Sequence, residues 1–281
     1  MNAFDGAMGL VAGLALSALI AWGGYAKRAL SRSGMLGAIL VGTTIFGFGG
    51  WTWGLVLIAF FLSSSWLSRY RWREKEHLAE KFAKTGHRDL GQTLANGGWA
   101  AILALFNFFY PSPALFAPFL GAMASVNADT WATELGVLSK SPPRSIASGK
   151  IVPVGTSGGI TLLGTGAAAL AATFIGLVAL LFDFLNSLVF QVNRSGPAFL
   201  IVLVSLAGGL TGAMFDSLLG ARAQGIYHCP RCDKETERRT HSCGQATTQV
   251  RGWRRLDNDG VNFLSSMVGS LTAYLLWRWW M

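Results

Sequence analysis

Long apolar stretches dominate this chain of 281 residues and limit the folds open to it. A bilayer core about 30 Å thick is crossed by a helix of roughly 20 mostly apolar residues. Eight stretches of about that length are bounded by charged residues or turn signals: 4–24, 34–50, 52–68, 92–110, 113–138, 157–183, 197–221 and 260–280. The chain is therefore predicted to be an all-α, polytopic integral membrane helix bundle of about eight spans, within a range of seven to nine. The whole of 1–281 is expected to form a single membrane domain.

The composition favours this class and excludes two others. Hydrophobic residues make up 52% of the chain and charged residues 13%, against about 25% charged in a typical soluble domain. Three cysteines are too few to hold together a disulfide-stabilised secreted fold of this size. No basic region precedes the first apolar stretch and no cleavage site is obvious, so we expect a retained helix and not a signal peptide.

The 23 Lys and Arg residues, against 14 Asp and Glu, are unevenly distributed along the chain. Nearly all of them lie in four loops between predicted spans: 25–33, 69–91, 139–156 and 222–259. With eight spans, these loops fall on one side of the membrane. Because cytoplasmic loops collect Lys and Arg, we expect the basic loops in the cytoplasm and both termini outside. Topology thus accounts for the net charge, and no nucleic-acid partner is expected.

Carboxylates within predicted spans are candidates for a functional site, because a charge in the membrane is costly unless a partner or an ion compensates it. In the fifth stretch, helical spacing places Asn127, Asp129, Thr130, Thr133 and Glu134 within an arc of about 160°. Two carboxylates among oxygen donors favour a divalent cation. A buried hydrogen-bonded network that fixes helix packing is the alternative.

The seventh stretch repeats small residues at intervals of four, with Gly208, Gly212, Asp216 and Gly220 on one face. Small residues at this spacing let helices approach closely, so Asp216 is expected to lie against a neighbouring helix. Either an ion or a basic partner such as Arg222 could compensate its charge.

A second polar cluster opens the last stretch, with Asp257, Asn258, Asp259 and Asn262. Carboxylates at a helix start are favourable electrostatically, and one of them can cap the helix. Capping by one carboxylate leaves the rest of the cluster available for a ligand.

A glycine-rich segment leads from Lys150 into the sixth stretch and contains Thr156, Ser157, Gly158 and Gly159. Converging backbone N–H groups, hydroxyl donors and the positive end of a helix can form a cradle for phosphate. The segment is not a Walker A sequence. Glycine used only for helix packing is the alternative explanation.

Cysteine and histidine are concentrated in the last basic loop, where Cys229, Cys232, His241 and Cys243 form a C-x2-C-x8-H-x-C pattern. Three thiolates and one imidazole satisfy tetrahedral Zn²⁺, so the spacing predicts a small structural, zinc-knuckle-like site. A redox C-x-x-C pair is the alternative, and His228 could replace His241 as the fourth ligand.

Five segments of the chain resemble the transmembrane protein 19-like family, which includes the chloroplast phytyl-phosphate kinase. They are Gly91–Gly97, Asn127–Gly136, Pro153–Gly159, Asp216–Ala221 and Leu256–Phe263. The resemblance implies a membrane kinase that transfers a phosphoryl group from CTP or another nucleotide to a prenyl monophosphate such as phytyl phosphate, giving the diphosphate. The cysteine-histidine cluster is not part of this resemblance and depends on its spacing alone.

The residues and the resemblance together assign roles to the polar groups. The expected catalytic carboxylates, which would bind Mg²⁺ or its water ligands, are Asp129, Glu134, Asp216 and Asp259. A larger set of polar and glycine residues is expected to hold the nucleotide and the phosphates: Asn96, Asn127, Lys150, Thr156, Ser157, Gly158, Gly159, Arg222, Asn258 and Asn262.

Other functions could use the same features. A transporter for a lipid phosphate or a small anion also employs glycine-rich helix ends and buried carboxylates. A CTP-dependent lipid-phosphate cytidylyltransferase would use CTP and Mg²⁺ but release pyrophosphate. A non-catalytic scaffold leaves the clustered carboxylates unexplained. No Ser- and Arg-rich transit peptide is evident, and the expected location is a prokaryotic cytoplasmic membrane.

Overall fold

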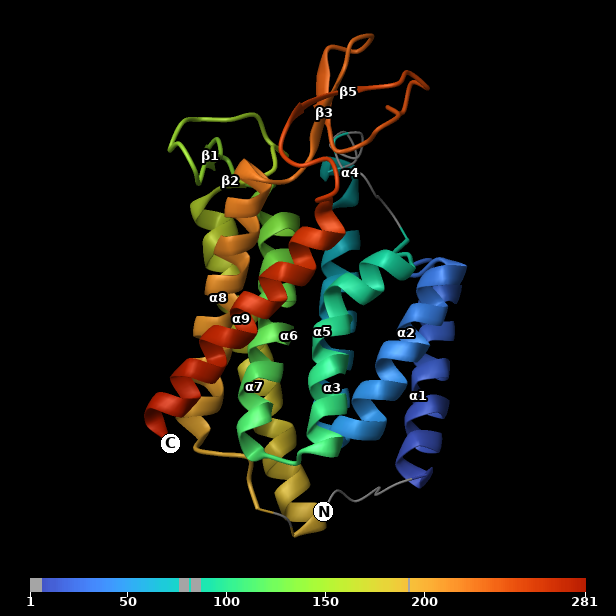
Figure 1. Ribbon diagram of the computed structural model, residues 1–281, viewed down its shortest axis with the longest axis vertical. Helices are drawn as coiled ribbons and strands as arrows, with labels where there is room; N and C mark the ends of the chain where they lie inside the picture. Colours follow the sequence, from blue (N-terminus) through green and yellow to red (C-terminus); the bar gives the residue numbers. More distant parts are fainter. Residues whose placement is uncertain (1–6, 76–80, 82–86, 192) are drawn as a thin grey trace.

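The computed structural model describes residues 7–75, 81, 87–191 and 193–281, and in these residues the chain is mostly helical (Figure 1). Each predicted apolar stretch contains a helix, and successive long helices run in opposite directions through one bundle. These helices are α1 (Ala7–Ala26), α2 (Arg32–Thr44) with the π-helical turn η1 (Ile45–Gly49), α3 (Trp51–Arg69), α5 (Leu90–Phe109), α6 (Phe116–Gly136), α7 (Leu162–Phe190), α8 (Ala198–Arg222) and α9 (Asn258–Trp280). Two short helices, α4 (Trp72–Lys75) and η3 (Pro113–Leu115), complete the helical part.

Side-chain caps fix where several helices begin. Ser31, Asp89, Thr161 and Asp257 each accept a hydrogen bond from the backbone N–H three residues later, which satisfies a donor that the helix itself leaves open. The cap at Thr161 corrects one prediction. The sixth stretch was expected to begin at 157, but the helix starts at Leu162, and the glycine-rich segment lies outside it.

Helix α6 is the centre of the bundle. Residues 116–128 of this helix are all buried, and the helix packs against α7, α8 and α9 while also touching α3 and α5. A helix that is buried all round needs no separate polar face towards water. Polar side chains on its later turns therefore point towards other helices.

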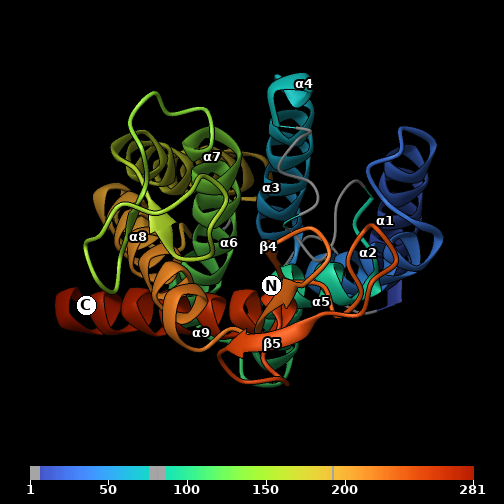
Figure 2. The ribbon, with the colours of Figure 1, turned by 90° about the horizontal axis from the view of Figure 1, so that it is seen from above.

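Helix α3 lies between two groups of helices. Seen from above, α6 to α9 lie on one side of it, and α1, α2 and part of α5 on the other (Figure 2). Its main contacts are with α6, α7 and η1, while α2 packs chiefly on α1 and α5. The bundle thus consists of a tightly packed half around α6 and a second half built on α1, α2 and α5.

The described parts of the four basic loops all lie at one end of the bundle, and the start of α1 and the end of α9 lie at the other (Figure 1). Two of these loops contain short strands, so the prediction of an all-α fold is wrong in this respect. β1 (Arg144–Ser145) pairs with β2 (Gly159–Ile160), and an antiparallel sheet in the order β4-β3-β5 joins β3 (Ile226–Cys229), β4 (Lys234–Thr236) and β5 (Thr248–Arg251).

By length and composition, four of the described helices can cross a membrane: α1, α3, α7 and α8. Polar side chains dilute the hydropathy of α6 and α9, and α2 has only 13 residues before the π-helical turn. The count of eight spans therefore stays a prediction, although the eight helices lie where the spans were expected.

Candidate functional site

A cavity of about 650 Å³ opens at the end of the bundle that carries the basic loops. Its walls come from the ends of α3, α6 and α8, the beginnings of α5, α7 and α9, and the glycine-rich segment between β1 and α7. Segments from almost the whole length of the chain therefore meet at one place. This cavity contains most of the residues that the sequence singled out.

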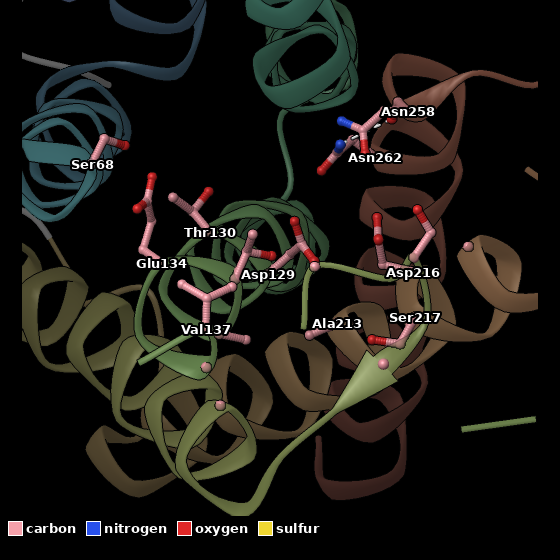
Figure 3. A pocket seen from close by; sticks show the side chains of 18 of the residues that line it. Ser68, Asp129, Thr130, Glu134, Val137, Ala213, Asp216, Ser217, Asn258 and Asn262 are labelled. Carbon is pink, nitrogen blue, oxygen red and sulfur yellow. Dashed lines mark hydrogen bonds between the residues drawn. The ribbon is translucent and has the colours of Figure 1, made fainter. Parts of the chain in front are cut away.

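Glycine packing brings two carboxylates together across this cavity. A Cβ on Gly208 would lie 2.8 Å from the Cα atom of Gly121, and a Cβ on Gly212 would lie 1.9 Å from the Oγ atom of Ser125. Helices α8 and α6 can approach this closely because the glycines leave the space open. One turn further along each helix, Asp216 of α8 and Asp129 of α6 face each other (Figure 3).

The Asp129 and Asp216 pair is incompletely compensated within the described part of the chain. The Oδ2 atom of Asp216 is buried and accepts no hydrogen bond. The charge of Asp129 acts directly on Asp216. Among the described residues Asp216 makes no ion pair with Arg222, whose exposed side chain lies outside the cavity wall. A buried polar atom without a partner requires an explanation, and a bound cation is one.

Helix α9 adds oxygen donors to the same side of the cavity. Asp257 caps the helix, with its Oδ1 atom accepting from the N–H of Gly260 at 3.0 Å. Asn258, Asp259 and Asn262 also line the cavity, and the Nδ2 atom of Asn262 donates to the backbone oxygen of Asn258 at 2.9 Å (Figure 3). This part of the wall, together with Asp129 and Asp216, is named the acidic side below.

The glycine-rich segment packs on the last turns of α8. A Cβ on Gly158 would lie 2.6 Å from both the nitrogen of Ala221 and the backbone oxygen of Ser217, and its φ angle is +81°. Both the space and the backbone conformation therefore require glycine here. Within the described chain, the N–H groups of Ser157 and Gly158 donate to no protein acceptor, and both residues line the cavity.

Cations occupy the opposite wall, which is named the cationic side below. Lys75 of α4 is only 6% exposed, forms an ion pair with Glu134 and donates to the backbone oxygen of Leu67 at 2.9 Å. Arg28, Arg69 and Arg88 line the same wall. Burial lowers the pKa of Arg88 to about 10, an effect that the nearby Glu134 carboxylate opposes, so the guanidinium keeps its charge at neutral pH.

The structure places the sequence-predicted residues as follows. The cavity is lined by Asn96, Asp129, Glu134, Thr156, Ser157, Gly158, Gly159, Asp216, Asn258, Asp259 and Asn262. Three of the predicted residues, Asn127, Lys150 and Arg222, are not in its wall.

Asn127, Lys150 and Glu134 differ from their predicted roles for separate reasons. Asn127 is fully buried and connects two helices, since its Nδ2 atom donates to the backbone oxygen of Ala171 at 3.0 Å and its Oδ1 atom accepts from Ser63 at 3.2 Å. Lys150 lies exposed in the turn before β2. Glu134 does line the cavity, but its partner is Lys75 on the cationic side, so the ion pair satisfies the charge that a metal was expected to meet.

Sequence reasoning did not include several residues of the wall among the site residues. Lys75 and Arg88 belong to the basic loop 69–91, whose positive charges were used to predict the membrane topology, and neither residue was assigned a role in the site. Gln224 and Glu237 come from the loop that contains the cysteines. The basic residue directly before the helix start at Asp89 was a usable signal for Arg88, but no spacing indicates Glu237.

The cysteine-histidine cluster has the geometry of a tetrahedral metal site. The ligand atoms of Cys229, Cys232, His241 and Cys243 all lie within 4.8 Å of one another. The Sγ atoms of Cys229 and Cys243 are 3.7 Å apart, close to the roughly 3.8 Å separation set by two Zn–S bonds of about 2.3 Å. His228 lies outside the cluster and contacts Asp233 at 3.0 Å, so His241 completes the set.

One thiol of the cluster already favours the thiolate form that metals bind. A hydrogen bond with His241 lowers the pKa of Cys243 to about 6. The cysteines are free, with no disulfide among them. The three thiols and His241 form a donor set that fits a metal ion.

The sheet that carries this cluster also holds the glycine-rich segment in place. Glu237 follows β4, and its Oε1 atom accepts from Ser157 Oγ at 2.9 Å and from Gln224 Nε2 at 2.8 Å. Arg251 of β5 donates to the backbone oxygen of Ala221 at 2.5 Å. Hydrogen bonds of Glu237 and Arg251 thus connect the sheet that carries the cluster to the cavity wall and to α8.

Comparison with known proteins agrees with the membrane architecture. The chain is 34% identical over 281 residues to Protein PGR of Arabidopsis thaliana, covering 95% of this chain and 94% of that protein. It is 31% identical over 257 residues to an uncharacterized membrane protein of Methanocaldococcus jannaschii, covering 89% and 87%. It is 25% identical over 252 residues to the chloroplastic Protein VTE6 of Arabidopsis thaliana, covering 88% and 65%.

No solved structure matches the chain. The model of the family described as integral membrane protein DUF92 matches residues 15–270. Together with these relatives, this match confirms the resemblance to the transmembrane protein 19-like family. The chain belongs to the DUF92 family of integral membrane proteins.

Proposed function

We propose that this protein is a membrane prenyl-monophosphate kinase, which transfers the γ-phosphoryl group of CTP or another nucleotide to a prenyl monophosphate. The observation that carries the proposal is the division of one cavity into an acidic side and a cationic side, with the glycine-rich segment in its wall. Phosphoryl transfer depends chiefly on positioning and on neutralising charge. This reaction suits a cavity in which one side can bind the nucleotide phosphates together with a metal cation and the other side can bind the acceptor phosphate through basic groups.

The acidic side fits Mg²⁺. Asp129 and Asp216 face each other, and the unpartnered Oδ2 atom of Asp216 leaves a buried acceptor open. Asp259, Asn258 and Asn262 add the carboxylate and carbonyl oxygens that Mg²⁺ prefers. When bound there, Mg²⁺ would neutralise the charge of the nucleotide phosphates. Glu134 is assigned to the cationic side and not to the metal, because it is paired with Lys75.

The glycine-rich segment would hold the phosphate chain of the nucleotide. The N–H groups of Ser157 and Gly158 are available as donors, and the Thr156 hydroxyl lines the same cavity. Backbone donors of this kind can form an anion-binding concavity. Gln224 and Glu237 keep the segment in position from the side of the sheet.

The cationic side would hold the acceptor. The phosphate of a prenyl monophosphate is ionised at neutral pH, so its oxygen can attack without a general base. Arg88 offers a planar guanidinium suited to bidentate phosphate contacts, and Arg69 and Lys75 add positive charge. In the transfer, a bond forms between this oxygen and the γ-phosphorus. The bond from the γ-phosphorus to the β-γ bridging oxygen breaks, and its electron pair leaves with the nucleoside diphosphate.

The proposal also covers how the chain crosses the membrane. The eight long helices would all span the membrane as a single domain, with the basic loops, the cysteine cluster and the cavity on the cytoplasmic side of a prokaryotic membrane and both termini outside. The position of all four basic loops at one end of the bundle supports this arrangement. The prenyl chain could then stay in the bilayer while its phosphate reaches the cavity.

Product analysis tests the function. Purified protein in lipid nanodiscs is incubated with γ-labelled CTP, Mg²⁺ and phytyl monophosphate, and both products are identified. A kinase gives labelled phytyl diphosphate and CDP. Release of pyrophosphate with a cytidylylated lipid would instead indicate a cytidylyltransferase, and counterflow of lipid phosphate in liposomes without nucleotide would indicate a transporter.

The cysteine-histidine cluster would hold one structural Zn²⁺ ion, with no open coordination position. We expect metal analysis of the purified protein to find one zinc per chain. Cys243→Ser should lose the zinc. His228→Ala is the matched control, because His228 lies in the same loop outside the cluster, and it should keep the zinc. A wild-type protein without zinc would remove this assignment.

A further inference from the structure

A second, apolar cavity adjoins the cationic side. Its volume is about 70 Å³, and its wall is almost entirely apolar. The lining comes from α1, α2, α3 and α5 together with Leu30, and includes Ala21, Ala38, Val41, Phe60 and Phe61. Two residues, Arg88 and Asn96, belong to both cavities. The two spaces are therefore neighbours with opposite chemistry.

Arg88 marks the boundary between them. Its guanidinium lies 5.7 Å from the ring centre of Phe60 and 5.9 Å from that of Phe61, and it donates to Ser65 Oγ at 3.4 Å. Backbone hydrogen bonds hold the residue against the turn between α1 and α2, from Arg88 to Ala29 and from Ser31 to Arg88, both at 3.0 Å. The positive charge is thus fixed directly beside the apolar cavity.

The arrangement of the helices explains why space remains here. Helix α3 packs mainly on α6, α7 and η1, and the apolar cavity lies between α3 and the group formed by α1, α2 and α5 (Figure 2). Small residues widen it on the side of α1 and α2, where Ala21, Ala38 and Gly42 line the wall. The cavity lies among apolar helices and not in a loop, so its natural occupant is apolar.

We propose that this apolar cavity binds the first part of the isoprenoid chain of the acceptor, with the phosphate of the same molecule at Arg88. The inference rests on the proposed function, because it takes the prenyl monophosphate as the acceptor. A molecule with one phosphate and an apolar branched chain matches the change from a fixed guanidinium to aromatic and aliphatic side chains over a few ångströms. The volume of about 70 Å³ is several times the roughly 10–15 Å³ that a cavity needs to hold one water, so it has room for a short apolar segment such as the start of the isoprenoid chain. The rest of the chain would lie between the helices and the bilayer.

Photolabelling tests the location without any turnover. The full chain in nanodiscs is irradiated with a prenyl monophosphate that carries a diazirine in its first isoprene unit, and the labelled peptides are identified by mass spectrometry. We expect labelling of α2 and α3, removed by excess unlabelled prenyl monophosphate. Labelling confined to the lipid-facing surfaces of α7 and α8, or labelling that unlabelled ligand does not remove, would overturn the proposal.

A variant that fills the cavity tests its effect on the reaction. Ala38→Phe should raise the KM for phytyl monophosphate about tenfold, the scale at which hydrophobic pockets respond to lost carbon groups, and leave the KM for CTP unchanged. Leu40→Phe is the matched control on the same helix, because Leu40 is 59% exposed and outside the cavity. An unchanged KM for phytyl monophosphate and unchanged labelling in folded Ala38→Phe would contradict the proposal. If this variant does not fold, the labelling of the wild-type protein tests the proposal instead.

The two proposals can fail separately. Suppose that α2 and α3 are labelled, that unlabelled ligand removes the labelling, and that no diphosphate forms. This result would support the chain-binding cavity and contradict the proposed kinase activity. Diphosphate formation with labelling at other helices would support the kinase activity and contradict the binding of the isoprenoid chain in this cavity.

Discussion

Two carboxylates with buried oxygen atoms, at opposite ends of the bundle, have contrasting surroundings. Asp183, near the far end of α7, is 3% exposed and satisfied by its neighbours: it accepts from the backbone N–H of Ser195 at 3.0 Å and from the Ser195 hydroxyl at 2.5 Å, and pairs with Arg194 at 3.4 Å. Asp216, at the cavity end of α8, faces Asp129, and its buried Oδ2 atom has no hydrogen-bond partner among the described residues.

The difference distinguishes a structural carboxylate from a ligand-binding one. A buried charge that the protein satisfies completely fixes a loop, here the connection from α7 to α8. A buried charge that the protein leaves open is costly in the free state and becomes favourable only when a cation is present. Burial of an acidic residue alone therefore does not identify a site, whereas incomplete compensation does.

The largest effect is expected for Asp216→Asn. The substitution removes one of two facing negative charges, so diphosphate formation should fall about 10²- to 10³-fold, the scale typical of losing one group that stabilises transition-state charge. Asp129→Asn should behave in the same way. Unfolding temperatures measured with and without Mg²⁺ provide the second readout: Mg²⁺ should stabilise the wild type but not the variant. Undiminished activity would remove these residues from the mechanism.

An intermediate effect is expected at Glu237, whose carboxylate is partly satisfied by Ser157 and Gln224. Glu237→Ala removes both contacts and frees the glycine-rich segment, so the KM for CTP should rise about tenfold, which corresponds to one hydrogen bond to a charged group. Glu237→Gln keeps an acceptor for the Ser157 hydroxyl and should restore most of the affinity. If the glutamine variant is as impaired as the alanine variant, the charge itself and not the positioning of the segment is important.

The smallest effect on activity is expected for Asp183→Asn. This change weakens the contacts with Arg194 and Ser195, so the free energy of unfolding should fall by about 2 kcal/mol, while activity per folded molecule stays within about twofold of the wild type. Thermal unfolding and a concentration-corrected assay measure the two quantities. Ser195→Ala is a milder control, since the backbone N–H of residue 195 still donates. A large loss of specific activity would contradict the assignment of Asp183 as a structural carboxylate, in contrast to Asp216.

The sequence was sufficient to predict the features that follow from local rules. Apolar length located the helices, and the distribution of Lys and Arg identified the loops that gather at one end of the bundle. The spacing of Gly208 and Gly212 predicted a close helix contact, and both glycines lie directly against α6 or α9. Helical periodicity also placed Asp129 on the polar face that the cavity uses.

Partners that are distant in the chain could not be predicted in this way. Lys75 and Glu134 are 59 positions apart, and nothing in either segment indicates that they pair. Asn127 shares a helix face with Asp129 in a wheel projection, yet it lies deeper in the bundle, where Ala171 and Ser63 use its side chain. The glycine-rich segment was expected at a helix entry, but Thr161 caps that helix and the segment rests on α8. Tertiary contacts determined each of these outcomes.

From the length of α7, we expect the protein to respond to membrane thickness. At 1.5 Å per residue, its 29 residues extend about 43 Å, well beyond a hydrocarbon core of about 30 Å. Its far end contains Asp183, Asn186 and Ser187 and finishes with the exposed apolar residues Leu188, Val189 and Phe190. Such a mismatch is met by tilting the helix or thickening the surrounding lipid. The other end of α7 borders the cavity. We therefore expect the acyl-chain length of the bilayer to affect the position of the α7 residues that line the cavity.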